Sequence, residues 1–159
     1  MATVSFGFAA DAQRSIGASE RRFWADHRGG VLVASGGGVS TRFGSGGPRV
    51  RVPGGAVALR LAGVGYGAAV ARVPGVGAPV ADRAQVRYRH GGLVEWYRNG
   101  PLGLEQGFTL TRRPAGRRVG PLTLAMAVNG SLVARRSAGQ IEFVSRSGAV
   151  RLRYGLRKS

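Results

Sequence analysis

The sequence predicts an all-β protein, either an antiparallel β-sandwich or a curled meander of strands. Apolar and polar residues alternate with period two along many short segments. In Arg49–Val52, for example, the valines face one way and the arginines the other. Turn residues separate these segments, and 28 of the 159 residues are glycine. Because glycine costs about 1 kcal/mol inside a helix, few helices are expected, and closely spaced strands then pair antiparallel.

One short helix precedes a series of strands. The helix is expected at Ser19–Asp26, where Ser19 could cap the first turn and Phe23 could face the core. The expected strands are Val31–Ser35, Val39–Phe43, Arg49–Val52, Ala56–Ala62, Gln85–His90, Leu93–Asn99, Phe108–Arg113, Leu122–Val128, Leu132–Arg136, Gln140–Ser145 and Ala149–Tyr154.

Turn residues predict two hairpins near the C-terminus. Asn129-Gly130 joins two alternating segments, and a type I′ turn favours this pair because both central residues need positive φ. Ser147-Gly148 joins the next pair of segments in the same way. The stretch Gly63–Pro79 is rich in glycine and proline, and is interpreted as either one irregular strand or an exposed loop.

A single domain is expected over residues 13–156. Residues 1–12 are interpreted as an N-terminal extension or a degenerate signal remnant, and residues 157–159 as a tail. No run of about 20 apolar residues occurs, so no membrane-spanning helix is expected. The expected core consists of Trp96, Phe108, Leu110, Leu122, Leu124, Phe143, Leu152 and Tyr154.

The charge is strongly basic, with 24 Lys and Arg against 7 Asp and Glu, which gives a formal net charge of +17. Arginines two residues apart on a strand project from one face of a sheet, which must be solvated or bound to an acidic partner. Arginine-rich polyanion or nucleic-acid binding is therefore one functional hypothesis, although no known nucleic-acid-binding motif occurs. The candidate contacts are Arg49, Arg51, Arg112, Arg113, Arg151 and Arg153.

Motifs for catalysis and for metal or cofactor binding are missing from the sequence. The chain has no cysteine and only two histidines, His27 and His90, which are far apart. His90 precedes Gly91-Gly92 and is interpreted as a turn residue. We therefore expect a noncatalytic protein without a cofactor or metal ion.

The most distinctive polar residues gather in one predicted hairpin, as Glu95, Trp96, Tyr97, Arg98, Asn99 and Glu105. Two carboxylates with neighbouring aromatic rings could bind or hydrolyse a glycan, if the carboxylates lie together. The alternative is that both acids neutralise arginines. Adjacent strand residues face opposite ways, so one of Trp96 and Tyr97 is expected in the core.

This hairpin also carries a resemblance to a known family. The quoted segments are Leu93-Val-Glu-Trp-Tyr-Arg-Asn-Gly-Pro-Leu-Gly-Leu-Glu-Gln-Gly-Phe-Thr-Leu110, Pro121-Leu-Thr-Leu-Ala-Met-Ala-Val-Asn-Gly130, Gly148-Ala-Val-Arg-Leu-Arg-Tyr154 and Gln13-Arg-Ser-Ile-Gly17. In this order they resemble an N-terminal module of large secreted or cell-surface proteins of high-GC bacteria, which precedes FG-GAP (integrin-like propeller), Ig-like or other β-repeat regions.

The resemblance covers about residues 13–156 and implies a structural or interaction module, extracellular or at the cell surface, with no active-site residues. Proteins of that family usually begin with a clear signal peptide and continue past the last strand. This chain differs at both ends, and we therefore expect a fragment or a degenerate copy, whose last sheet is incomplete at the C-terminus.

Overall fold

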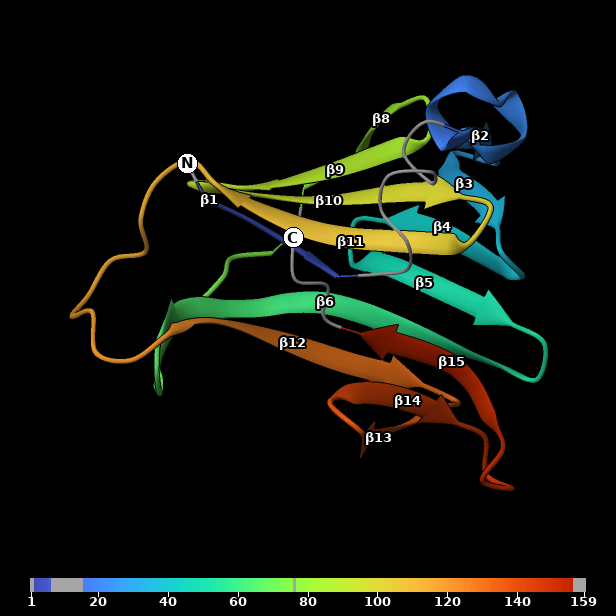
Figure 1. The fold of residues 1–159 in the computed structure, drawn as a ribbon. Helices are drawn as coiled ribbons and strands as arrows, with labels where there is room; N and C mark the ends of the chain where they lie inside the picture. Colours follow the sequence, from blue (N-terminus) through green and yellow to red (C-terminus); the bar gives the residue numbers. More distant parts are fainter. Residues whose placement is uncertain (1, 7–15, 76, 156–159) are drawn as a thin grey trace.

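The computed structural model describes residues 2–6, 16–75 and 77–155 (Figure 1). The described strands form three antiparallel sheets, which confirms the prediction of an all-β fold. Residues 2–6 of the expected N-terminal extension form a strand. The rest of that segment and the expected tail at 157–159 lie outside the described residues.

The largest sheet has seven strands. Its order is β12-β6-β5-β4-β3-β2, and β7 pairs with the second half of β6. The twelve-residue strand β6 connects the sheet, because its first residues pair with β5 and most of its length, from Val57 to Tyr66, pairs with β12. The bounds are β2 (Asp26–Arg28), β3 (Val31–Gly36), β4 (Val39–Gly44), β5 (Gly47–Val52), β6 (Gly55–Tyr66), β7 (Ala69–Arg72) and β12 (Leu122–Gly130).

Two smaller sheets complete the described fold. The five-stranded sheet has the order β1-β11-β10-β9-β8, with β1 (Ala2–Phe6), β8 (Val80–Asp82), β9 (Gln85–His90), β10 (Leu93–Gly100) and β11 (Gly103–Leu110). The three-stranded sheet has the order β13-β14-β15, with β13 (Val133–Ser137), β14 (Gln140–Val144) and β15 (Val150–Gly155).

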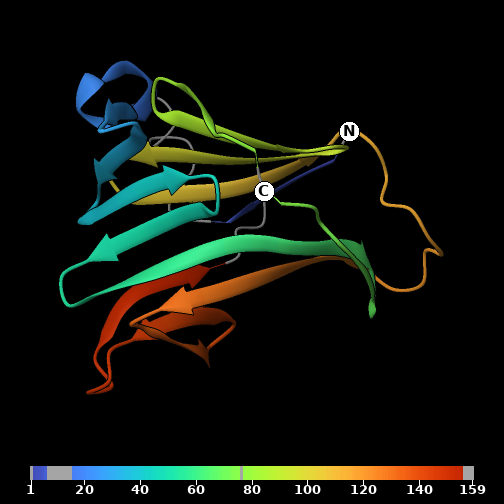
Figure 2. The ribbon, with the colours of Figure 1, turned by 180° about the vertical axis from the view of Figure 1, so that it is seen from behind.

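Both smaller sheets pack on the same face of the seven-stranded sheet. Phe43 of β4 packs with Tyr97 of β10, with ring centroids 5.5 Å apart. Val57 and Leu59 of β6 pack with Phe143 of β14. These contacts give a β-sandwich-like arrangement whose second layer is divided in two. Figures 1 and 2 show the three-stranded sheet beside β6 and β12 from both sides. Full burial of one such side chain contributes about 1.5–3 kcal/mol.

The predicted core residues occupy three kinds of position. Phe108, Leu110 and Phe143 are buried in the core. Half-buried side chains pack against the core at Leu122, Leu124, Leu152 and Tyr154. Trp96 is also buried, but it lies on the outer face of the five-stranded sheet, opposite its neighbour Tyr97.

Two local predictions need correction. Instead of the expected helix at Ser19–Asp26, a helical turn ends at Ser19 and a separate three-residue 3₁₀ helix follows, η1 (Arg21–Phe23). Its cap is Glu20 rather than Ser19, whose hydroxyl donates to the carbonyl of Ile16 at 3.2 Å. Phe23 is nonetheless buried, as expected. The strand expected at Phe108–Arg113 instead spans Gly103–Leu110, because the turn before it ends at Gly103 with φ of 115°.

The hairpin predicted at Asn129-Gly130 is wrong, whereas that at Ser147-Gly148 is confirmed. Asn129 and Gly130 remain within β12 and pair with β6, and β13 pairs with β14 in another sheet. The long partner β6 thus keeps both residues extended and overrides the local turn preference. β14 and β15 do form a hairpin, in which Gly148 has φ of 83°. Strands β2 and β8 were not predicted, whereas β7 lies within Gly63–Pro79, where one irregular strand was one of the two interpretations.

Candidate functional site

The register of β10 and β11 divides the predicted polar centre between two faces. Glu95 and Tyr97 point toward the seven-stranded sheet, whereas Arg98 points outward and lies opposite Glu105. Glu95 and Glu105 are therefore on opposite faces of the five-stranded sheet. They do not form the paired carboxylates that a glycoside hydrolase needs.

Glu95 is buried, and polar side chains other than arginine surround its carboxylate. One oxygen, Oε2, lies 2.9 Å from His90 Nε2. The other oxygen accepts hydrogen bonds from the Tyr97 hydroxyl and, at 2.8 Å, from Gln106 Nε2. The expectation that Glu95 neutralises an arginine is thus wrong. His90 lies beside a turn, as expected, but its buried side chain is a partner of Glu95.

Gln106 extends this network across two sheets. Its Nε2 also donates to the Tyr97 oxygen at 2.7 Å, and its Oε1 accepts a hydrogen bond of 2.7 Å from the hydroxyl of Tyr154 on β15. Burial, together with the nearby charge of Glu95, raises the pKa of Tyr88, Tyr97 and Tyr154. These phenols therefore stay neutral and keep donating hydrogen bonds, which indicates a structural role.

Asn99 ties β10 to η1 and to β3 of the seven-stranded sheet. Its Nδ2 donates to the carbonyls of Phe23 at 3.0 Å and Ser35 at 2.7 Å. A buried amide that bridges a 3₁₀ helix and a neighbouring sheet fixes their relative positions. Asn99 is therefore also structural.

On the outer face, Trp96 is held flat against β11. Its Nε1 donates to Thr109 Oγ1 at 3.2 Å, and the Arg98 guanidinium carbon lies 4.4 Å from the ring centroid. A Cβ at Gly107 would collide with the indole. Since only 6% of Trp96 is exposed, it offers no open surface on which a sugar or base could stack.

Four arginines of the central strands β4, β5 and β6 share the outer face of the seven-stranded sheet, which the other two sheets leave uncovered. Arg42 of β4 lies directly opposite Arg49 of β5 in the register, and Arg51 follows Arg49 on the same face. Arg60 of β6 also points outward, because its neighbours Leu59 and Leu61 are buried. We call Arg42, Arg49, Arg51 and Arg60 the arginine face.

The arginine face is not neutralised within the described part of the chain, where none of its members forms a salt bridge. Like charges that face each other across two strands are destabilising. The sequence prediction found Arg49 and Arg51 but missed Arg42 and Arg60. The alternation in Thr41-Arg42-Phe43 and Leu59-Arg60-Leu61 could have revealed both.

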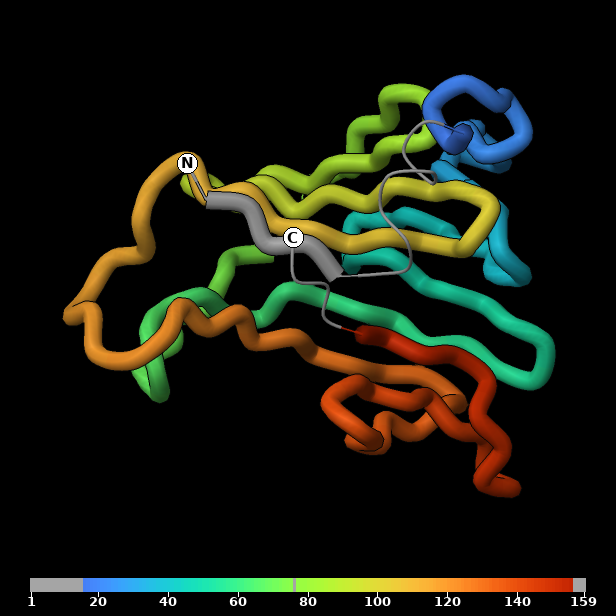
Figure 3. The backbone as a smooth tube through the Cα atoms, viewed as in Figure 1, coloured from blue at the N-terminus to red at the C-terminus, as the bar shows by residue number. Residues whose placement is uncertain are grey.

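The other candidate arginines lie elsewhere. Arg112 and Arg113 belong to the exposed loop between β11 and β12, which extends away from the sheets in Figure 3. Arg151 and Arg153 lie on β15, where Arg153 Nε is 3.4 Å from Glu142 Oε1. The six predicted contacts therefore do not form one surface.

Glu142 pairs with two arginines of the three-stranded sheet. Arg135 on β13 contacts its Oε2 at 2.7 Å, while Arg153 approaches from β15 on the other side. The hydrogen bond from Arg135, supported by the charges of both guanidinium groups, lowers the pKa of Glu142 although its burial opposes this. Arg153 is thus paired with Glu142 within the three-stranded sheet.

The described residues hold neither a cluster of metal ligands nor a membrane-spanning helix. Within the described ranges, no three His, Cys, Asp or Glu side chains gather to hold a metal ion. No helix in that part of the chain has the length and apolar character needed to cross a bilayer.

Comparisons with protein-family models, with characterised proteins and with solved structures found no match to the chain.

Proposed function

We propose that this protein is a noncatalytic interaction module whose arginine face binds an acidic polymer. The observation that carries the proposal is the direct opposition of Arg42 and Arg49, with Arg51 and Arg60 on the same face. Such an arrangement opposes folding unless anions approach it, and a bound polyanion would remove the repulsion.

The chemistry of the face favours recognition by charge. Val33, Ser40 and Ala58 lie beside the arginines on the same face, and none of these side chains is large or aromatic. The acid on this face is Asp26, which is opposite Val33 and forms no salt bridge with the arginine face among the described residues. Residues two apart on a strand are separated by about 6.8 Å, and neighbouring strands by about 4.8 Å. A polymer with repeated anionic groups can contact all four arginines at such spacings, whereas a single small anion can contact only neighbouring ones.

An acidic polymer outside the cell is the partner that suits the expected location. The resemblance of the Leu93–Leu110 segment to modules of secreted and cell-surface proteins supports an extracellular role. Nucleic acid is the alternative polyanion, and the arginine face would bind its phosphates without reading bases. We favour the surface polymer because, among the described residues, no exposed aromatic ring on this face could stack on a base.

The test compares two double variants with the same change in charge. Arg42→Gln/Arg49→Gln alters the arginine face, and Arg112→Gln/Arg113→Gln alters the loop. Binding to a sulfated glycosaminoglycan and to duplex DNA is measured at about 50 and about 200 mM salt. We expect the first variant to lose at least about tenfold in affinity for the glycosaminoglycan, and the second much less.

Three outcomes contradict the proposal: no binding at low salt, equal losses in the two variants, or a clear preference for DNA. Equal losses would indicate attraction by net charge alone. A preference for DNA would favour the alternative partner.

A further inference from the structure

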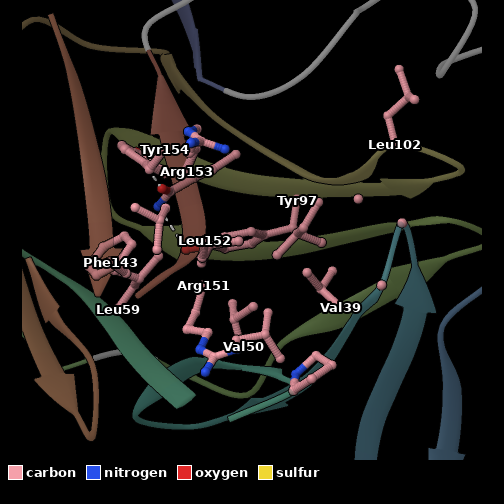
Figure 4. A pocket seen from close by; sticks show the side chains of 18 residues that line it. Val39, Val50, Leu59, Tyr97, Leu102, Phe143, Arg151, Leu152, Arg153 and Tyr154 are labelled. Atoms are coloured by element: carbon pink, nitrogen blue, oxygen red, sulfur yellow. Dashed lines mark hydrogen bonds between the residues drawn. The ribbon is translucent and has the colours of Figure 1, made fainter. Parts of the chain in front are cut away.

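A pocket of about 470 Å³ lies between the two smaller sheets, above the seven-stranded sheet. Figure 4 shows its walls: Leu152 and Tyr154 of β15 on one side, Leu102 on the other, and Val39, Val50 and Leu59 from the large sheet. The volume falls within the range of about 300–1,000 Å³ that is typical of small-molecule sites. The pocket is on the opposite side of the large sheet from the arginine face, so the two are independent.

The interior of this pocket is mainly apolar. Aliphatic and aromatic side chains from all three sheets supply most of the lining, including Val50, Leu59 and Phe143. Gln106 and Tyr97 also reach the pocket, but Gln106 already donates to Glu95 and Tyr97 and accepts from Tyr154. The Tyr97 hydroxyl donates a hydrogen bond to Glu95. The inner wall therefore favours an apolar group.

The charge at this pocket comes from β15. Arg151 and Arg153 both contribute to the lining, and in Figure 4 they lie on either side of Leu152. Arg153 is paired with Glu142. Arg151 forms no salt bridge with a described residue, and its guanidinium rests against the turn at Gly54, where a Cβ would lie 3.2 Å from Cζ. One positioned cation thus borders an apolar pocket.

We propose that this pocket binds an amphipathic monoanion, with an apolar tail between the sheets and one carboxylate at Arg151. The tail would contact Val50, Leu59 and Phe143 and remove their remaining surface from water. The carboxylate would accept charge-assisted hydrogen bonds from the guanidinium, whose planar donors match its two oxygens. A single head group fits because Glu142 already holds Arg153.

Isothermal titration calorimetry with ligands that share one tail tests the proposal. The probes are decanoate, decanol and decyltrimethylammonium, at physiological salt so that distant charges are screened. We expect decanoate to bind one per chain, with decanol at least about tenfold weaker and the cation not binding. Binding of decanol or the cation as tight as that of decanoate overturns the role of Arg151. No saturable binding of decanoate overturns the site itself.

Two matched pairs of variants locate the binding. Arg151→Gln should weaken decanoate about tenfold, whereas Arg146→Gln, in the exposed turn between β14 and β15, should not. Val52→Trp fills the pocket and should abolish binding, whereas Val133→Trp on the exposed face of β13 should not. Leu104→Phe, a smaller change in the lining, replaces Val52→Trp if circular dichroism shows that the latter is unfolded. Equal effects within either pair contradict the proposal.

Discussion

At the scale of single residues, the buried Glu95 network governs how the protein responds to base. Tyr88 and Tyr97 are fully buried beside Glu95, and burial raises their pKa above the ordinary value of 10.0. The folded state thus keeps phenolic protons that the unfolded chain releases. Stability from these residues is complete below pH 10 and is lost as the pH rises further, because unfolding then releases protons.

We predict that the fall in the free energy of unfolding approaches about 1.4 kcal/mol per pH unit above pH 10 for each of these two tyrosines and for Tyr154, whose pKa burial also raises. Urea unfolding at about pH 9, 10 and 11 measures the slope, and only one lysine is present to titrate in the same range. Tyr88→Phe, which also loses a hydrogen bond to the carbonyl of Gly44, should reduce the slope by one tyrosine's share. An unchanged slope in this variant contradicts the prediction.

The sequence reveals these residues only in part. It indicated that Glu95 and Tyr97 belong to one polar centre and that one of Trp96 and Tyr97 is buried. It could not pair Glu95 with His90, because that contact depends on the side chains turning into a shared interior. Tyr154 reaches Gln106 from another sheet, and no local pattern encodes a contact over such a separation in the chain.

At the scale of elements, the β13–β14 turn contains a residue that its conformation does not suit. Ala138 has φ of 44° and precedes Gly139, with φ of 80°. In this left-handed region of backbone conformation, a residue other than glycine, asparagine or aspartate costs about 1 kcal/mol, because Cβ approaches the backbone carbonyl. The hairpin nonetheless forms, since β14 packs on β6 through Phe143.

We predict that Ala138→Asn increases the free energy of unfolding by about 0.5–1 kcal/mol, since Asn-Gly suits a two-residue turn of this type. Ala138→Val is the matched control and should decrease stability, because a β-branched side chain is strained at positive φ. Ala138 is exposed, so neither change disturbs the core. Urea unfolding midpoints measure both, and a loss of stability in Ala138→Asn would refute the explanation.

Strands with clear alternation were the elements that the sequence predicted best. Val39–Phe43 and Ala56–Ala62 alternate because each has one face on the core, and both lie within observed strands. The hairpin predicted at Asn129-Gly130 does not form, because pairing with β6 outweighs the local preference of these two residues for a turn. Short strands such as Asp26–Arg28 are exposed and carry no apolar pattern, so the sequence gives no sign of them.

At the scale of the whole molecule, the net charge of +17 should make stability depend on ionic strength. Repulsion among exposed arginines opposes the compact state, and added salt screens it over about 10 Å at 0.1 M. We predict that Tm rises as sodium chloride increases from about 10 to about 200 mM. The Tm of the Arg49→Gln variant should rise less with salt than that of the parent protein, because the substitution removes the charge opposite Arg42. Differential scanning calorimetry measures both, and a Tm that falls with salt contradicts the prediction.

The division of the second layer has a consequence for the order in which the protein can mature on the ribosome. Val57 and Leu59 are synthesised early. The residues that pack over them, Leu132 and Phe143, follow more than seventy residues later. Until then the nascent chain carries an apolar strip along β6 with no sheet above it. Newly made chains are therefore open to association through that strip, and truncation before β14 would make this exposure permanent.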